Sequence, residues 1–260
     1  RSWKAGSKVT PAMSGYLNTR LSARQYTNNL LGIEVEFDVS PGANAYPPHG
    51  DAPETYNGLE LFMVRPNWIR PLSITFESYR QTVDYGHGRV AQFNPVEFTS
   101  RYIQANYLGK NSAEVDRITA FFDRMKGQRG EFYMPTWTED FWPKITLREG
   151  TQTMRIAGTE FFTDYGSSQV YRNFIFFLTD GTTIIRHIDS IYEVDDFDGH
   201  DTGIQITEPW PRDIAVEEIK MACWLPRWRF ASDALNVEWL TDGSAQFVLN
   251  FRTIEDLEGI

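Results

Sequence analysis

Two Asp-Gly pairs, each placed between two apolar runs, constrain the fold of this chain more than any other feature. The pairs and their runs are Asp180-Gly181 between 170–178 and 182–188, and Asp242-Gly243 between 235–239 and 246–251. Asp-Gly tolerates the positive φ angles of a tight type I′ turn, whose twist matches that of the flanking strands. The sequence therefore predicts two β-hairpins in its second half.

Short apolar or alternating stretches continue through most of the chain, as is typical of β-strands. The further predicted strands are 31–39, 59–64, 72–79, 96–102, 153–157, 204–207 and 214–225. Aromatic residues form 15% of the chain, and they favour both strands and protein–protein contacts. We therefore expect a mainly β fold of the α+β kind.

One helix is expected, at 111–126. Asn111 can cap it, and Glu114 three positions later completes a capping box. Four apolar residues recur at helical spacing and so fall on one face: Val115, Ile118, Phe122 and Met125. Gly127 and Gly130 suit the end of the helix, because glycine readily takes the left-handed conformation found there.

The 260 residues suffice for one large β domain or for two of ordinary size. We expect a β-sandwich-like domain at 1–150, which includes an N-terminal arm and the helix. A second β-rich domain, or a continuation of the same fold, is expected at 151–260. The arm is 1–30, where apolar residues follow no clear period, and the Pro- and Gly-rich stretch 40–53 predicts a long exposed loop.

Composition argues against two classes of function. The formal net charge is −10 and Lys and Arg form no cluster, whereas nucleic-acid-binding proteins usually show a basic patch. We expect no sequence-specific binding to nucleic acid. The acidic balance serves either solubility or the lining of a conduit through which DNA passes. The longest apolar run, 174–178, is too short to cross a bilayer, so no membrane insertion is expected.

Motifs that carry chemistry are missing from the sequence. HExxH, GxSxG, Walker A and GxGxxG do not occur, and the single cysteine, Cys223, excludes a disulfide framework within the chain. His187 lies in a strand-like stretch, where a packed or exposed histidine is a simpler interpretation than a catalytic base. We therefore expect a protein that is not an enzyme, with no catalytic residues and no cofactor.

The acidic stretch 195–201 raises a metal-site hypothesis. Closely spaced carboxylates can bind Ca²⁺, and the candidate ligands are Asp196, Asp198 and Asp201. Their order is not that of an EF-hand, and a solvated, turn-forming loop is the simpler interpretation. We expect no resident metal ion at this stretch.

The helix is followed by Gly127-Gln-Arg-Gly130 and then by Glu131-Phe-Tyr-Met-Pro-Thr-Trp137. This order, with the strand 96–102 before the helix, resembles a pattern in tail-tip proteins of long-tailed bacteriophages. The stretch 233–251 resembles the closing hairpin of such proteins. Neither segment contains an invariant chemical site.

The resemblance implies a distal tail protein or a neighbouring baseplate hub protein, with β-sandwich or tail-tube-like sheets and a flanking helix. It implies a homo-oligomeric ring, hexameric for a distal tail protein or trimeric for a hub. Such a ring continues the tail tube, so the expected partners are the tail tube protein, the baseplate hub and the receptor-binding proteins. The expected location is the virion, after synthesis in the cytoplasm of the host bacterium.

Interfaces of this kind favour aromatic residues. The candidate interface anchors are Trp68, Trp137, Trp142, Trp210 and Trp228. Each could equally belong to the hydrophobic core, and the sequence leaves both interpretations open.

A carbohydrate-binding or glycoside-cleaving β protein is the alternative function. It would use rows of exposed aromatic side chains, such as those within 132–142, and paired carboxylates such as Asp195, Asp196 or Asp198. Sugar binding and turnover would distinguish it from a structural protein.

Overall fold

A computed structural model describes residues 15–27, 30–39, 53–69, 72–77, 81–93, 100–168, 171–196 and 199–254. Strands account for 48% of the structure and helices for 14%, which confirms the mainly β class. The chain forms two compact units, Arg1–His49 and Gly50–Ile260. The sequence-based division at residue 150 falls inside the second unit, and 40–52 of the predicted loop lie outside the described residues.

The described part of the first unit is one antiparallel strand pair. Strand β1 (Gly15–Thr27) pairs with β2 (Leu30–Val39), and the register runs from Gly15 opposite Val39 to Thr27 opposite Leu30. The strand predicted at 31–39 is confirmed. The extended arm predicted within 1–30 is wrong for residues 15–27, where a long paired strand takes its place; the scattered apolar pattern there gave no clear strand signal.

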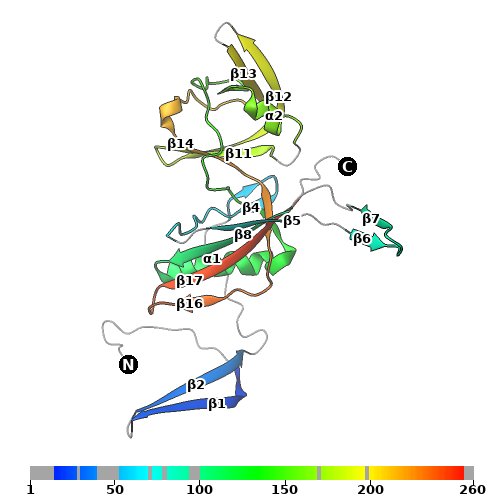
Figure 1. The fold of residues 1–260 in the computed structure, drawn as a ribbon. Helices are drawn as coiled ribbons and strands as arrows, with labels where there is room; N and C mark the ends of the chain where they lie inside the picture. The colour runs from blue at the N-terminus through cyan, green and yellow to red at the C-terminus, as the bar shows by residue number, and fades with distance from the viewer. Residues whose placement is uncertain are drawn as a thin grey trace, which may run out of the picture. The chain divides into compact units, whose positions relative to one another are not determined.

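The second unit is built on an eight-stranded sheet (Figure 1). Its main path is β3 (Thr55–Tyr56), β4 (Leu59–Leu61), β9 (Glu131–Tyr133), β15 (Arg227–Phe230), β17 (Ala245–Thr253), β8 (Ser100–Gly109) and β5 (Ser73–Glu77). The eighth strand, β16 (Val237–Trp239), pairs with β17 off this path. Among the described strands of this sheet, only the β4–β9 pair is parallel. The strands of this sheet therefore come from both sides of the long stretch between β9 and β15.

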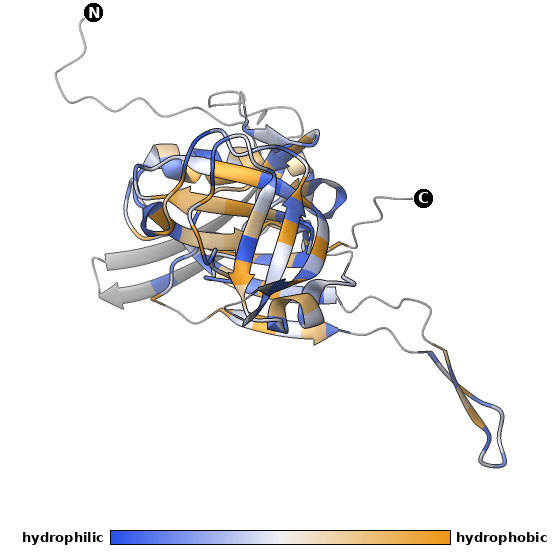
Figure 2. Cartoon of the chain, turned by 90° about the horizontal axis from the view of Figure 1, so that it is seen from above, coloured by the Kyte–Doolittle hydropathy of each residue, from blue (hydrophilic) through white to orange (hydrophobic). Residues whose placement is uncertain are grey.

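Alternation along the strands gives this sheet one apolar face, and Figure 2 shows the change between apolar and polar residues. In β17, Ala245, Phe247, Leu249 and Phe251 are buried, while Val248 between them is exposed. Residues at every second position of a strand point to the same face. The buried face forms a core with helix α1 (Ser112–Met125), which contributes Val115, Ile118, Phe121, Phe122 and Met125.

Helix α1 confirms the helix predicted at 111–126. Asn111 is its N-cap, and the Asn111 side chain accepts a hydrogen bond from the Glu114 backbone N–H at 2.9 Å. The predicted reciprocal bond differs, because the Glu114 carboxylate accepts from the Lys110 N–H at 2.9 Å. The C-cap after Met125 is Lys126, which itself takes the left-handed conformation with φ 53° ahead of Gly127. A 3₁₀ turn, η1 (Gly127–Arg129), then leads into β9.

A five-stranded antiparallel sheet is inserted between β9 and β15. Its order is β10 (Thr153–Ala157), β13 (Gly199–Ile206), β12 (Thr183–Asp196), β11 (Asn173–Leu178) and β14 (Ile219–Trp224). A short helix that the sequence did not predict, α2 (Glu160–Tyr165), packs against this sheet, and the 3₁₀ turn η2 (Val216–Glu218) precedes β14. Inside, the Trp210 ring stacks on Phe176 with an interplanar angle of 2°.

The segment 134–147 runs along both edges of this five-stranded sheet. On the β14 edge, the N–H groups of Thr136 and Asp140 donate to the carbonyls of Trp224 and Ala222 at 3.0 and 2.9 Å. On the β10 edge, the Lys144 N–H donates to the Arg155 carbonyl at 2.7 Å. A strand edge without such partners is open to pairing with another chain, so this segment protects both ends of the sheet.

The two hairpins predicted at the Asp-Gly pairs are confirmed. The type I′ conformation predicted for their turns is wrong. Strands β11 and β12 flank the first pair, and β16 and β17 flank the second. A type I′ turn needs positive φ at both central residues. Gly181 has φ 88°, but Asp180, Asp242 and Gly243 do not have positive φ. The Asp180 carboxylate instead accepts from the Thr182 N–H at 2.8 Å, so the side chain shapes the turn.

The positive-φ pair of a type I′ turn occurs elsewhere. Asn57 and Gly58 have φ 46° and 78° between β3 and β4, and Tyr56 pairs with Leu59. Asn-Gly is a favoured sequence for this turn. A further hairpin, β6 (Gln81–Asp84) with β7 (Val90–Phe93), turns through Gly86 and its neighbours.

Replacing Phe251 by alanine tests the core of the eight-stranded sheet. Phe251 is fully buried, and its ring lies within 6.5 Å of the rings of Phe62, Tyr107, Phe132, Trp228 and Phe230. We expect Phe251→Ala to lower the free energy of unfolding by about 3–5 kcal/mol, because it leaves a cavity among rings. Urea unfolding followed by circular dichroism measures the change.

Val248→Ala is the matched control, since Val248 lies on the same strand but is 38% exposed. We expect its unfolding free energy to stay within about 0.5 kcal/mol of the unmodified chain. Equal losses for the two variants would contradict the assignment of faces.

Candidate functional site

The structure separates the five candidate interface tryptophans into two groups. Trp68 and Trp142 are exposed, at 44% and 37% of their surface, so the interface prediction stays open for them. The other three are buried, and the core interpretation applies to them: Trp137, Trp210 and Trp228.

Each buried tryptophan has a packing or hydrogen-bonding role. The Trp210 and Trp228 indole N–H groups donate to the carbonyls of Thr153 and Met134 at 3.2 and 3.0 Å. The Trp137 ring stacks on Phe177 with the centroids 5.2 Å apart. The three buried tryptophans therefore make their contacts within the chain itself.

The candidate metal ligands lie on the β12–β13 hairpin. Asp196 is the last residue of β12, and only its backbone belongs to the described part of the structure. Asp198 lies outside the described residues. Asp201 lies in β13 and is buried, with a side chain only 5% exposed.

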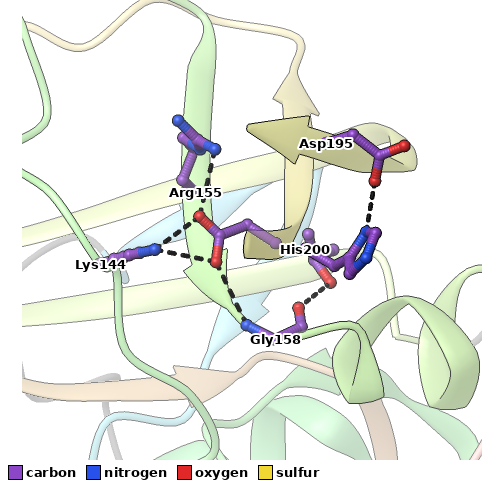
Figure 3. A network of polar contacts seen from close by, with 7 residues as sticks. Lys144, Arg155, Gly158, Asp195 and His200 are labelled. Atoms are coloured by element: carbon purple, nitrogen blue, oxygen red, sulfur yellow. Dashed lines mark hydrogen bonds and ion pairs between the residues drawn. The ribbon is translucent and has the colours of Figure 1, made fainter. Parts of the chain in front are cut away.

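Asp201 is the centre of a polar network in which two cations meet one carboxylate (Figure 3). The Lys144 ammonium donates to both carboxylate oxygens at 3.0 and 2.8 Å. An Arg155 guanidinium nitrogen lies 3.1 Å from one of them. The Gly158 N–H donates at 3.4 Å. The hydrogen bond from Lys144, more than any other influence, holds the pKa of the Asp201 carboxyl below its usual range.

This setting opposes a role for Asp201 as a calcium ligand. A Ca²⁺ ion would have to displace Lys144 and Arg155, which already neutralise the carboxylate. Among the described residues, no group of three or more His, Cys, Asp and Glu side chains is placed to hold a metal ion. The network instead ties the segment that carries Lys144 to strands β10 and β13.

The same hairpin carries an exposed His–Asp pair. The His200 Nδ1 atom lies 2.6 Å from the Asp195 carboxylate, directly across the two strands (Figure 3). The hydrogen bond with Asp195 raises the pKa of His200 above its ordinary value. Both side chains are more than three-quarters exposed, at 76% and 80%, so solvent screens the pair and its contribution to stability is small.

His187 is a half-buried strand residue, as the sequence suggested. Its Nδ1 lies 2.9 Å from the Asn173 side-chain oxygen, which also accepts from the Tyr56 hydroxyl at 3.2 Å. The three side chains link the eight-stranded sheet to the five-stranded one. Cys223 is also buried, and desolvation raises the pKa of its thiol to about 12.

Sequence reasoning missed Lys144 and Arg155, the partners of Asp201. They lie 57 and 46 positions away from it along the chain, and no local motif joins the three residues. Neither helix in the described residues has the length and hydropathy of a membrane-spanning segment.

The two segments that carry the phage resemblance come together in one sheet and one core. Strand β8 pairs with β17 along eight successive positions, from Tyr102 opposite Arg252 to Gly109 opposite Ala245. Strand β9 pairs with β15, which pairs with β17 in turn. Helix α1, between β8 and β9, packs onto the same strands. Segments far apart in sequence thus form one structural module, hereafter the sheet–helix module.

Comparisons with known proteins add no family to this description. Neither the models of known protein families nor the curated proteins gave a match to the chain.

Neutralising Asp201 tests the polar network. Because its pKa is depressed in the folded state, the stability that it contributes is fully present above the ordinary carboxyl pKa of about 3.9 and is lost as pH falls through the folded-state value. We expect Asp201→Asn to lower the urea midpoint at pH 7, and the difference from the unmodified chain to shrink below about pH 4.

The matched control is Asp195→Asn, which removes an exposed carboxylate on the same hairpin. We expect it to shift the midpoint far less at pH 7. A loss for Asp201→Asn that is the same at every pH would contradict an electrostatic role for the network.

Proposed function

We propose that this chain is a structural subunit of a bacteriophage tail tip, which assembles into a ring that continues the tail tube and joins it to the hub and receptor-binding proteins. The observation that carries the proposal is the sheet–helix module. Its two sequence segments resemble those of tail-tip proteins, and they pack against each other through β8, β17 and α1.

The order of elements within the module supports the proposal. Strand β8 leads into α1, the turn Gly127–Arg129 follows, and β9 begins at Glu131. Gly127 has φ 61°, and a Cβ built there would lie 2.5 Å from the Asp233 carboxylate, so the tight turn needs glycine. The Gln128 N–H donates to that carboxylate at 2.8 Å. This contact joins the Arg-Gly turn to the start of the closing segment. A specific hydrogen bond therefore links the two segments that resemble tail-tip proteins.

A role in assembly also agrees with the edges of the sheets. The segment 134–147 covers both edges of the five-stranded sheet, whereas β5 at the end of the eight-stranded sheet pairs only with β8 among the described residues. A neighbouring subunit can complete such an edge. Head-to-tail contacts between identical subunits close into a ring when the rotation permits. Under this proposal the protein is located in the virion.

The oligomeric state tests the proposed function. Light scattering of the full chain, eluting from a sizing column, should give six or three times the 30.0 kDa of one chain, for a distal tail protein or a hub respectively. Negative-stain micrographs of that peak should show rings as wide as a phage tail. Incubation with bacterial polysaccharide should release no reducing sugar. A stable monomer that cleaves polysaccharide would overturn the proposal in favour of the carbohydrate-active alternative.

A further inference from the structure

Two arginines face each other across neighbouring strands of the eight-stranded sheet. Arg229 in β15 is paired directly with Arg252 in β17. Residues paired in this way share a face, with Cβ atoms about 4.5–5.5 Å apart, and like charges directly opposite each other destabilise a sheet. The chain has a net charge of −10, so carboxylates that could balance the two cations are plentiful in its sequence.

The pair lies on the face of the sheet that is opposite the core. The neighbours of the two arginines along their strands are buried in the core with α1: Trp228, Phe230 and Phe251. Because side chains alternate along a strand, Arg229 and Arg252 point to the other face. Both are half-buried there, and solvent still reaches the guanidinium nitrogens of Arg229.

No carboxylate balances the pair within the described part of the chain. Glu131 is opposite Arg229 on its other side, but the ion pair of Glu131 is with Arg227, at 3.7 Å. The Arg252 guanidinium donates to the neutral hydroxyl of Ser100 at 3.3 Å. Among the described residues, the Arg229 guanidinium has neither a hydrogen-bond partner nor an ion-pair partner.

Hydroxyl groups continue this row of the sheet beyond the arginines. Tyr102 in β8 is opposite Arg252, and Thr75 in β5 is opposite Tyr102. The row therefore offers two guanidinium groups and two hydroxyls as donors, from four neighbouring strands. Glu77 shares this face on β5, but it is exposed and forms no ion pair with either arginine.

Adjacent guanidinium groups are suited to an oxyanion. The planar fork of arginine matches the oxygens of carboxylates and phosphates, and its charge-assisted hydrogen bonds are stronger than neutral ones. Two neighbouring positive charges are balanced by a dianion better than by one carboxylate. A phosphate group supplies close to two negative charges and several acceptor oxygens. Partial burial strengthens such bonds, because the local dielectric is lower than that of water.

We propose that Arg229 and Arg252 form a binding site for a phosphate group, with Tyr102 and Thr75 as further donors. The inference goes beyond the proposed ring and does not depend on it. A bound phosphate offsets the repulsion between the two guanidinium groups, so binding stabilises the folded chain.

Inorganic phosphate added to the full chain tests the site. Thermal melting over a phosphate titration is compared with sodium chloride at the same ionic strength, which separates a bound anion from general screening. We expect a saturating rise in the melting temperature of the unmodified chain. Arg229→Gln with Arg252→Gln should weaken the dissociation constant for phosphate by about tenfold or more, because charge-assisted hydrogen bonds are lost.

Arg148→Gln with Arg212→Gln is the matched control. It removes the same charge from two arginines that lie outside this row and pair with Asp213 and Glu218. We expect this variant to bind phosphate as the unmodified chain does. An unmodified chain without a saturating response, or an equal loss of binding in both double variants, would overturn the site.

Stability without phosphate gives a second measurement. Removing a like-charge pair should leave the urea midpoint of the Arg229→Gln and Arg252→Gln variant unchanged or raised in phosphate-free buffer. A lowered midpoint together with unchanged phosphate binding would show a purely structural role and overturn the site. If the double variant fails to fold, the single variant Arg229→Gln replaces it and should still weaken phosphate binding.

Glycerol 1-phosphate distinguishes the two sources of a phosphate group. Binding of this ester as tight as that of inorganic phosphate would assign the site to a phosphorylated ligand. Binding of inorganic phosphate alone would assign it to the free anion. Binding of neither probe would overturn the inference while leaving the proposed ring intact.

Discussion

The packing of aromatic rings against one face of the eight-stranded sheet is the interaction on which the second unit depends. Phe62, Phe121, Phe132, Phe230 and Phe251 come from five separate parts of the chain, and in nine of their ten pairs the ring centroids lie 4.7 to 6.4 Å apart. Because β9 and β15 flank the inserted five-stranded sheet in sequence, this cluster also holds the two ends of the insertion side by side.

The inserted sheet depends instead on a segment that covers its two edges. The segment 134–147 starts where β9 ends, runs along β14 and then along β10, and so covers the edges that would otherwise attract other chains. Asp201 fixes the far end of this segment through Lys144. Many of the exposed large apolar side chains lie away from this sheet, around β5 and the β6–β7 hairpin.

Local patterns in the sequence predicted the local structure well. The cap at Asn111 and the apolar spacing predicted α1, and the Asp-Gly pairs located two hairpins. The turn type failed because Asp180 shapes its turn with a side-chain hydrogen bond rather than with a positive φ. Contacts between residues far apart in the chain could not be predicted from the sequence. Nothing in the sequence distinguished the buried Trp137, Trp210 and Trp228 from exposed tryptophans. No residue near Asp201 indicated that Lys144 would be its partner.

The central claim is that this protein acts by joining identical copies into a closed assembly. Sedimentation velocity of the full chain over a wide range of concentration tests it most directly. A closed ring should give a single large species whose sedimentation coefficient reaches a plateau, since it cannot add further copies. A species of 30.0 kDa at every concentration, or growth without a plateau, would contradict it.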